Sequence, residues 1–179
     1  MCSYLLDLKH LQYLDLSCND FGSLNIPEFF GSLSTLRYLN LSSAGFCGVI
    51  PHQLGNSSKL HYLYIGNSNY YRKDSLNAKD IEWISGLTFL KFLDMTNVNL
   101  SKASNWLQVM NKFHSSSVQH LSNCELHTVN PLPHVKFSSL VILDLTVNYF
   151  ISSSFDWFVN LNSLVTLNLV SSNIYGPIP

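Results

Sequence analysis

Three residues in the second half of the chain have the types and spacing of metal ligands: His120, Cys124 and His127. Imidazole and thiolate side chains at such intervals are typical of zinc sites, and His114 and His134 lie nearby in the sequence. The repeat pattern described below offers a simpler interpretation, because it makes Cys124 a buried turn residue and His120 an outward-facing strand residue. We therefore expect no metal site, no cofactor and no catalytic set of residues in this chain.

The composition excludes several other kinds of site. Only 12% of the 179 residues are Asp, Glu, Lys or Arg, and the net charge is -1, so a basic surface for nucleic acid is not expected. Hydrophobic residues make up 46% of the chain, which is too much for a disordered protein. No apolar run approaches the roughly 18 residues of a membrane span, so we expect no membrane contact by this segment. Leu, Ser and Asn are in excess, with 30, 26 and 18 copies, and such a bias suggests an internal repeat.

The repeat is the frame L-x-x-L-x-L, seen clearly at Leu36, Leu39 and Leu41. Slots are counted here from the first residue of this frame. The first slots lie at residues 11, 36, 60, 90, 116, 140 and 164. Their spacing of about 24 residues is typical of leucine-rich repeats. We therefore treat residues 1–179 as a single domain of about seven repeats, numbered one to seven below.

The frame predicts the architecture. Alternating Leu residues indicate a short strand with its leucines facing inward and the residues between them facing outward. Stacked repeats bury these leucines in one continuous apolar spine. We expect an α/β-type solenoid, a right-handed superhelix with a parallel sheet on its concave face and turns, 3₁₀ pieces or short helices on its convex side. Trp83, Trp106 and Trp157 fall in the return segments and are predicted to pack on the convex side.

Two departures from the frame predict local weakness. The ninth slot, where an Asn side chain normally satisfies backbone groups of the turn, keeps Asn only in repeats one and six, and Ala44 or Val98 there is predicted to leave polar atoms unpaired. Ser116 and Gln119 replace two spine leucines in the fifth repeat, which should make it the weakest part of the stack. Cys124 is expected to be a buried thiol.

The fuller frame L-x-x-L-x-L-S-x-N-x-F-x-G-x-I-P resembles plant extracellular leucine-rich repeats, most clearly from Leu36 to Pro51. The runs around Trp106, Cys124 and Pro131 look like receptor-like proteins related to fungal-xylanase-elicitor receptors, in the disease-resistance group. The resemblance implies a glycoprotein on the extracellular side of the cell membrane that acts in defence or developmental signalling. It also implies a peptide or protein ligand and a co-receptor kinase as partners.

The resemblance leaves alternatives open. The chain shows no signal-like segment, terminal caps or membrane helix, so we expect it to be a slice of a longer receptor-like ectodomain. A secreted inhibitor of cell-wall-degrading enzymes is a second interpretation. A truncated fragment without independent function is a third.

The outward-facing strand slots are the candidate binding surface, because solenoids usually bind on their concave face. In the first four repeats these slots combine aromatic rings with a mildly basic column and carboxylates, and Tyr and Arg are favoured in binding hot spots. An aromatic ladder that only stabilises the sheet is the alternative interpretation. The candidate ligand-binding residues are Tyr13, Asp15, Arg37, Tyr38, Tyr62, Tyr64, Lys91, Phe92 and Asp94.

An insertion loop and three glycosylation sequons are further candidate functional features. The 30-residue spacing between the third and fourth repeats marks an insertion loop at about 66–87, which includes Tyr70, Tyr71, Arg72, Lys73, Asp74 and Lys79. Such a loop is either functional or simply solvated. Glycosylation sequons begin at Asn40, Asn56 and Asn99. The sequence does not show how Cys2, Cys18 and Cys47 pair, if they do.

Overall fold

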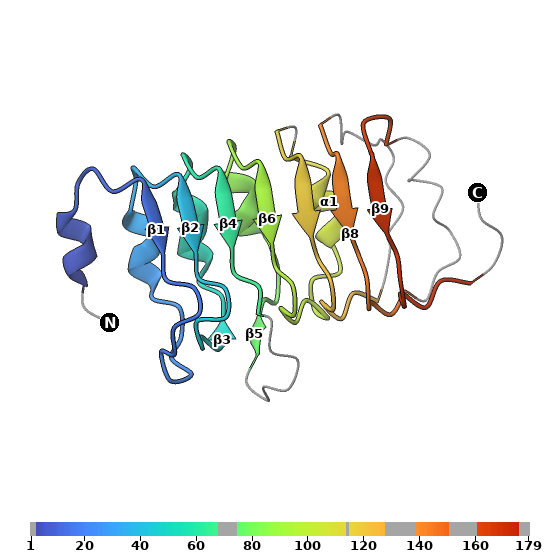
Figure 1. Cartoon of the computed structure of the whole chain (residues 1–179), viewed down its shortest axis with the longest axis horizontal. Helices are drawn as coiled ribbons and strands as arrows, with labels where there is room; N and C mark the ends of the chain where they lie inside the picture. Colours follow the sequence, from blue (N-terminus) through green and yellow to red (C-terminus); the bar gives the residue numbers. More distant parts are fainter. Residues whose placement is uncertain (1–2, 68–74, 114, 128–138, 151–160, 176–179) are drawn as a thin grey trace.

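The computed structural model describes residues 3–67, 75–113, 115–127, 139–150 and 161–175. The predicted leucine-rich-repeat fold is confirmed, because every repeat adds one strand to the same parallel sheet (Figure 1). The strands follow one another in chain order, and β1 and β9 lie at opposite ends of the row. They are β1 (Tyr13–Asp15), β2 (Tyr38–Asn40), β4 (Tyr62–Tyr64), β6 (Phe92–Asp94), β7 (Val118–His120), β8 (Ile142–Asp144) and β9 (Thr166–Asn168).

Each strand spans three residues, the third to fifth slots of its repeat. The pairing is in register, so equal slots of neighbouring repeats lie side by side, as Leu39 does beside Leu63. Because side chains alternate between the two faces of a strand, the fourth slot points into the core while the third and fifth point outward. The repeat therefore converts each sequence slot into a column of side chains that runs across the sheet.

The chain returns on the other side of the sheet through short helical turns (Figure 1). These are the 3₁₀ helices η1 (Ser3–Asp7), η2 (Glu28–Ser32), η3 (His52–Asn56) and η4 (Glu82–Gly86), and the single α-helical turn α1 (Trp106–Met110). A second, two-stranded parallel sheet pairs β3 (Gly48–Val49) with β5 (Leu76–Asn77). Pro27 and Pro51 directly precede η2 and η3, where the fixed φ of proline suits the start of a helix.

The core lies between the main sheet and these return turns. The fourth-slot leucines Leu39, Leu63 and Leu93 are fully buried, and burial of each such side chain stabilises the fold by about 1.5–3 kcal/mol. Trp106 is also buried in this core, on α1 as predicted, whereas Trp157 lies outside the described residues. At the end of the row Leu167 is 36% exposed, because β9 has a described neighbour on one side only.

The ninth-slot side chains bond the turns of successive repeats together. Asn148 donates from Nδ2 to the carbonyl of Leu121 in the preceding repeat, at 2.9 Å, and its Oδ1 accepts the backbone N–H groups of Cys124 and Leu126. Residues that replace Asn can keep part of this bonding. The thiol of Cys124 donates to the carbonyl of Met95 at 3.1 Å, as a weak substitute for the amide.

Cys124 is fully buried, as the sequence predicts. Burial raises the pKa of its thiol well above the ordinary value, because a thiolate would lose its hydration in the core. This cysteine is therefore a neutral structural donor. A ligand role for it, in a metal site with His120 and His127, would need the thiolate form.

The eighth slot adopts the left-handed conformation in repeat after repeat. Its φ is 53° at Ser43, 62° at Asn97, 51° at Asn123 and 55° at Val147. Asn tolerates this region, but a β-branched residue such as Val147 is strained in it. The sixth repeat therefore carries a local backbone cost.

The fifth repeat buries polar side chains where its neighbours bury leucines. Ser116 and Gln119 are each 1% exposed. Ser116 Oγ and both amide heteroatoms of Gln119 have no hydrogen-bond partner within the described part of the chain. A buried polar group without a partner costs about 1–3 kcal/mol, which supports the prediction that this repeat is the weakest.

The segment expected to be an insertion loop is partly ordered into the repeat. Residues 68–74, which include Tyr70 to Asp74, lie outside the described residues. After them, β5 pairs with β3, and Leu76 is buried. The loop expectation is therefore wrong for the end of this segment, because apolar residues there join the second sheet and η4.

Candidate functional site

The third-slot column places aromatic side chains on four neighbouring strands. Tyr13, Tyr38, Tyr62 and Phe92 are in register across β1, β2, β4 and β6. Tyr13 is 60% exposed and Tyr62 is 40% exposed. These side chains lie on the outward face of the sheet, called the concave face below and defined by the second, third and fifth slots.

The rings form a ladder that crosses from the third-slot column to the fifth. Tyr13 stacks on Tyr38 with ring centroids 4.1 Å apart, Tyr38 lies 5.4 Å from Tyr64, and Tyr64 stacks on Phe92 at 4.5 Å. His120 continues the series at 5.5 Å from Phe92. We call these five residues the aromatic ladder. Such contacts stabilise a sheet by about 0.5–1.5 kcal/mol per pair, so the ladder has a structural role whatever it binds.

The fifth-slot carboxylates have a structural role that the sequence analysis did not anticipate. Asp15 Oδ1 accepts the backbone N–H and the hydroxyl of Ser17 at 2.9 and 2.6 Å. Asp94 accepts the backbone N–H of Thr96 in the same way, at 2.9 Å. These are Asx-type turns, in which a side chain satisfies the backbone two residues on. The recurring D/N-x-S/T triplet that begins at the fifth slot was the sequence signal for them.

Asp15 also joins the hydroxyls of the ladder. Its Oδ2 accepts hydrogen bonds from Asn40 Nδ2 at 3.2 Å and from the hydroxyls of Tyr13 and Tyr38 at 3.5 Å. The bonds from Ser17, above all, hold the pKa of Asp15 below its ordinary value. Burial, with the hydrogen bond to Tyr13 next, raises the pKa of Tyr38 to about 12. The Asp15 carboxylate is therefore ionised and the Tyr38 phenol neutral at physiological pH.

A cationic column borders the ladder. The second slots of repeats two, three and four hold Arg37, His61 and Lys91, each directly before its strand β2, β4 or β6. Burial, then the charges of Lys91 and Arg37, lowers the pKa of His61, so the positive charge of the column comes from Arg37 and Lys91. Within the described residues no ion pair includes Arg37 or Lys91. His61 is not among the predicted site residues, although the sequence places it between Arg37 and Lys91 in the second-slot column.

The three residues with metal-ligand spacing do not converge. His120 lies on the concave face, with Nδ1 3.7 Å from Asp144 Oδ2. Cys124 is in the core, and the ring of His127 packs 5.9 Å from that of Tyr149. In the described ranges no group of three His, Cys, Asp or Glu side chains is placed to hold a metal ion. His114 and His134 lie outside those ranges.

The sequon asparagines differ in their surroundings. Asn56 is exposed at the end of η3. Asn40 is half-buried and donates from Nδ2 to Asp15 and to the Tyr38 hydroxyl. Asn99 donates from Nδ2 to Glu125 at 2.9 Å. A glycan is attached at Nδ2, so it would displace these contacts at Asn40 and Asn99 but none of this kind at Asn56.

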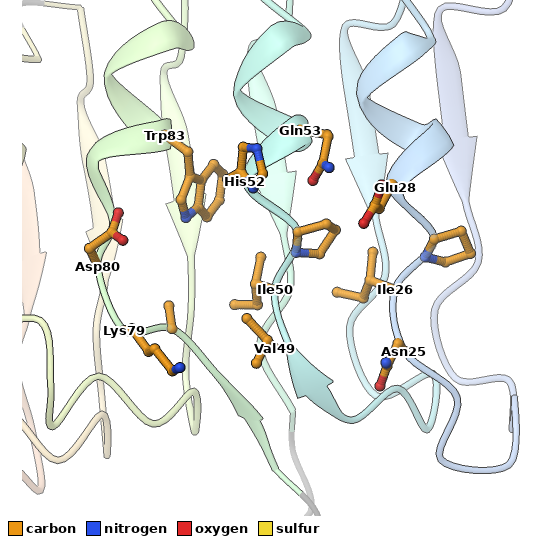
Figure 2. A pocket seen from close by; sticks show the side chains of 13 residues that line it. Asn25, Ile26, Glu28, Val49, Ile50, His52, Gln53, Lys79, Asp80 and Trp83 are labelled. Atoms are coloured by element: carbon orange, nitrogen blue, oxygen red, sulfur yellow. The ribbon is translucent and has the colours of Figure 1, made fainter.

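A cavity of about 570 Å³ opens on the return side of the sheet, away from every predicted site residue except Lys79 of the insertion. Figure 2 shows it between the row of helical turns η2, η3 and η4 and the strands of the second sheet. Its lining consists of Asn25, Ile26, Pro27, Glu28, Val49, Ile50, Pro51, His52, Gln53, Ala78, Lys79, Asp80 and Trp83. We call it the flank cavity.

No helix in the described residues has both the length and the apolar character needed to cross a membrane.

Comparison with known proteins agrees with this geometry. The Leucine Rich Repeat family model matches residues 10–33 and 35–57. Receptor-like protein EIX1 of Solanum lycopersicum is 40% identical over 97% of the chain, which spans 17% of that protein. The chain thus covers only about a sixth of the length of the curated relatives it matches.

Solved structures show the same fold. A TDR receptor structure superposes over 100% of the chain with a TM-score of 0.82 at 24% identity, and the chain covers 30% of it. The ectodomain of the Arabidopsis receptor kinase HAESA, in complex with the peptide hormone IDA and the co-receptor SERK1, is 25% identical with a TM-score of 0.66. That match includes 94% of this chain and 27% of HAESA.

Proposed function

The chain belongs to the plant leucine-rich-repeat receptor-like proteins, and on that premise we propose that its concave face binds a peptide or protein ligand at the first four repeats. The proposed role is recognition without catalysis, in defence or developmental signalling. The proposal places this segment on the extracellular side of the cell membrane, as part of a longer receptor.

One observation carries the proposal: the outward slots of the first four repeats gather most of the aromatic ladder, the exposed ring of Tyr62 and two cations, Arg37 and Lys91, that form no ion pair within the described residues. Rings that stack on their neighbours are rigid, so they offer contact area at a small cost in conformational entropy. Cations without a carboxylate partner add charge that a ligand can complement. The cations and the rings follow the same strands, so an extended ligand could contact both.

The roles of individual candidates follow from their contacts. Tyr13, Tyr38, Tyr62 and Phe92 would supply the contact area, and Arg37 and Lys91 the charge. Asp15 and Asp94 already hold turns, so we propose that they position the ladder and keep it rigid, with Tyr64 between them. This assigns the carboxylates an indirect part in binding.

Signalling is proposed to require another protein, because the sequence leads us to expect no catalytic set in this segment. The HAESA complex contains a co-receptor as well as a peptide, and we propose by analogy that a co-receptor kinase joins the receptor of which this chain is a part. Asn56 is the proposed glycosylation site, ahead of Asn40 and Asn99, because it is exposed and its amide makes no hydrogen bond to the described part of the chain.

The test uses a random peptide library displayed on phage, selected on the folded full chain. Hydrogen–deuterium exchange with a selected peptide should slow at the amides in and next to β1, β2, β4 and β6. Protection confined to β8, β9 or the flank cavity would contradict the proposal. A peptide with a scrambled sequence controls for nonspecific protection.

A further inference from the structure

The flank cavity arises where the chain departs from its own repeat. Two residues separate β3 from η3, whereas four residues, 78–81, separate β5 from η4. Counted onward from the pairs Gly48–Leu76 and Val49–Asn77, Lys79 and Asp80 take the places in the sequence that Pro51 and His52 have in the preceding repeat. The extra length therefore places two charged residues on the wall of the cavity. Local breaks in an otherwise regular pattern are expected at functional sites.

The cavity has an apolar floor and a polar rim. Ile26, Ile50 and Ala78 form the floor and are buried. Glu28, Lys79 and Asp80 are exposed on the rim. Figure 2 shows the indole of Trp83 and the side chain of Gln53 extending from their helical turns above this floor. The volume lies within the range of about 300–1,000 Å³ that small-ligand sites occupy.

Several polar groups of the lining lack a partner. Trp83 Nε1, a donor, and Gln53 Oε1, an acceptor, are buried without a hydrogen bond in the described part of the chain. In the same residues, Glu28 and Lys79 form no ion pair.

We propose that the flank cavity binds a neutral sugar unit, at a site separate from the concave face. Each sugar hydroxyl both donates and accepts hydrogen bonds, which suits a rim that presents acceptors on Glu28 and Asp80 beside the donor Lys79. The apolar C–H faces of a sugar ring suit the floor of Ile26, Ile50 and Ala78 and the flat indole of Trp83. Two carboxylates against one ammonium leave the rim with one excess negative charge, which disfavours an anionic ligand.

The neighbouring chemistry argues against a purely cationic ligand. An arginine side chain would pair with Glu28 and Asp80 and stack on Trp83. Lys79 lies on the same rim and would repel it. A sugar unit uses the ammonium and both carboxylates together.

The test is saturation-transfer-difference NMR on the full chain with cellobiose and chitobiose as probes. We expect saturation transfer to at least one disaccharide. Transfer to cellobiose indicates a glucan-type source, and transfer to chitobiose, used as its neutral N,N′-diacetyl form, indicates a source built from N-acetylglucosamine. Transfer to neither sugar overturns the proposal. So does binding of Nα-acetylarginine amide without binding of either sugar.

Blocking variants locate the binding. Val49 is 53% exposed on the lip of the cavity, so Val49→Trp should fill the opening without disturbing the core and weaken binding about tenfold or more. Val165→Trp is the matched control, because Val165 is 80% exposed on the concave side. Lys79→Trp provides a second block if Val49→Trp does not fold. Sugar binding that survives both blocks in folded protein overturns the assignment. A peptide-binding defect on the concave face would leave this result unchanged, so the two proposals fail separately.

Discussion

On the concave face, the third-slot column is aromatic from β1 to β6 and changes to Val118, Ile142 and Thr166 from β7 to β9. The core changes at the same boundary. The fourth slot is Leu93 in β6 and Gln119 in β7, although the two residues are paired in register and equally buried. The same repeat fold therefore carries different outward surfaces in its two halves. The fold requires apolar side chains at most inward slots, whereas the outward slots are free to vary.

The difference suggests that ligand binding and structural support belong to different repeats. The first four repeats have an apolar spine and a rigid aromatic surface, which suits a binding face. The fifth repeat instead buries Ser116 and Gln119 at spine slots, and the sixth carries the strained Val147. The comparison can be tested by moving residues across the boundary, starting with the change that should have the largest effect.

Leu93→Gln transfers the polar residue of β7 into β6 and should destabilise the fold by about 3–5 kcal/mol, from lost apolar burial and an unpaired amide. Urea denaturation followed by circular dichroism measures the change. Leu93→Met is the control and should cost less than about 1.5 kcal/mol. A loss from Leu93→Gln no larger than that of the control would mean that the fourth repeat tolerates polar burial as the fifth does.

Gln119→Leu is the reverse change and should stabilise the chain by about 1–3 kcal/mol, because it removes one buried amide whose oxygen and nitrogen have no partner among the described residues. The same denaturation series measures it, with Gln12→Leu on an exposed second slot as the control. Destabilisation by Gln119→Leu would show that the amide has a favourable role in the core.

Val147→Asn should relieve the left-handed strain of the sixth repeat and stabilise by about 1 kcal/mol. Asn already occupies this slot at Asn97 and Asn123 with φ of 62° and 51°. The melting temperature of Val147→Asn should rise above that of the wild type. The control Val170→Asn, at an exposed position, should leave it nearly unchanged.

The smallest effect concerns Asp15 and pH. Its folded pKa is lowered from the ordinary value of 3.8, so its contribution to stability is present above that value and is lost as the pH falls through the folded pKa. The difference in melting temperature between the wild type and Asp15→Asn should shrink as the pH is lowered below this range. A difference that is constant with pH would contradict the role of the charge, which is small in any case because Asp15 is exposed.

The sequence was sufficient for the strands and their register, because the Leu frame marks each inward residue directly. It was also sufficient to identify Ser116 and Gln119 as polar replacements in the spine. It could not show that Tyr64 lies between Tyr38 and Phe92, because side-chain rotamers, and not slots, decide contacts between columns.

The flank cavity could not be predicted from the sequence either. The insertion of the third repeat was visible as a longer spacing, but the sequence did not show that two of its residues fall after β5. That division depends on the pairing of Leu76 and Asn77 with β3, a contact between short strands that lack the Leu frame. The turn-capping carboxylates could have been found, because their triplet recurs in the sequence.

The central claim is that recognition belongs to the first four repeats. Its most direct test is the dissociation constant of a library-selected peptide for the double variant Tyr38→Ala with Tyr62→Ala. The matched control is Ile142→Ala with Thr166→Ala, which truncates the same slot on β8 and β9. We predict that the tyrosine variant remains folded and binds about tenfold or more weakly, while the control binds as the wild type does. Unchanged affinity in the folded tyrosine variant, or an equal loss in the control, would contradict the claim.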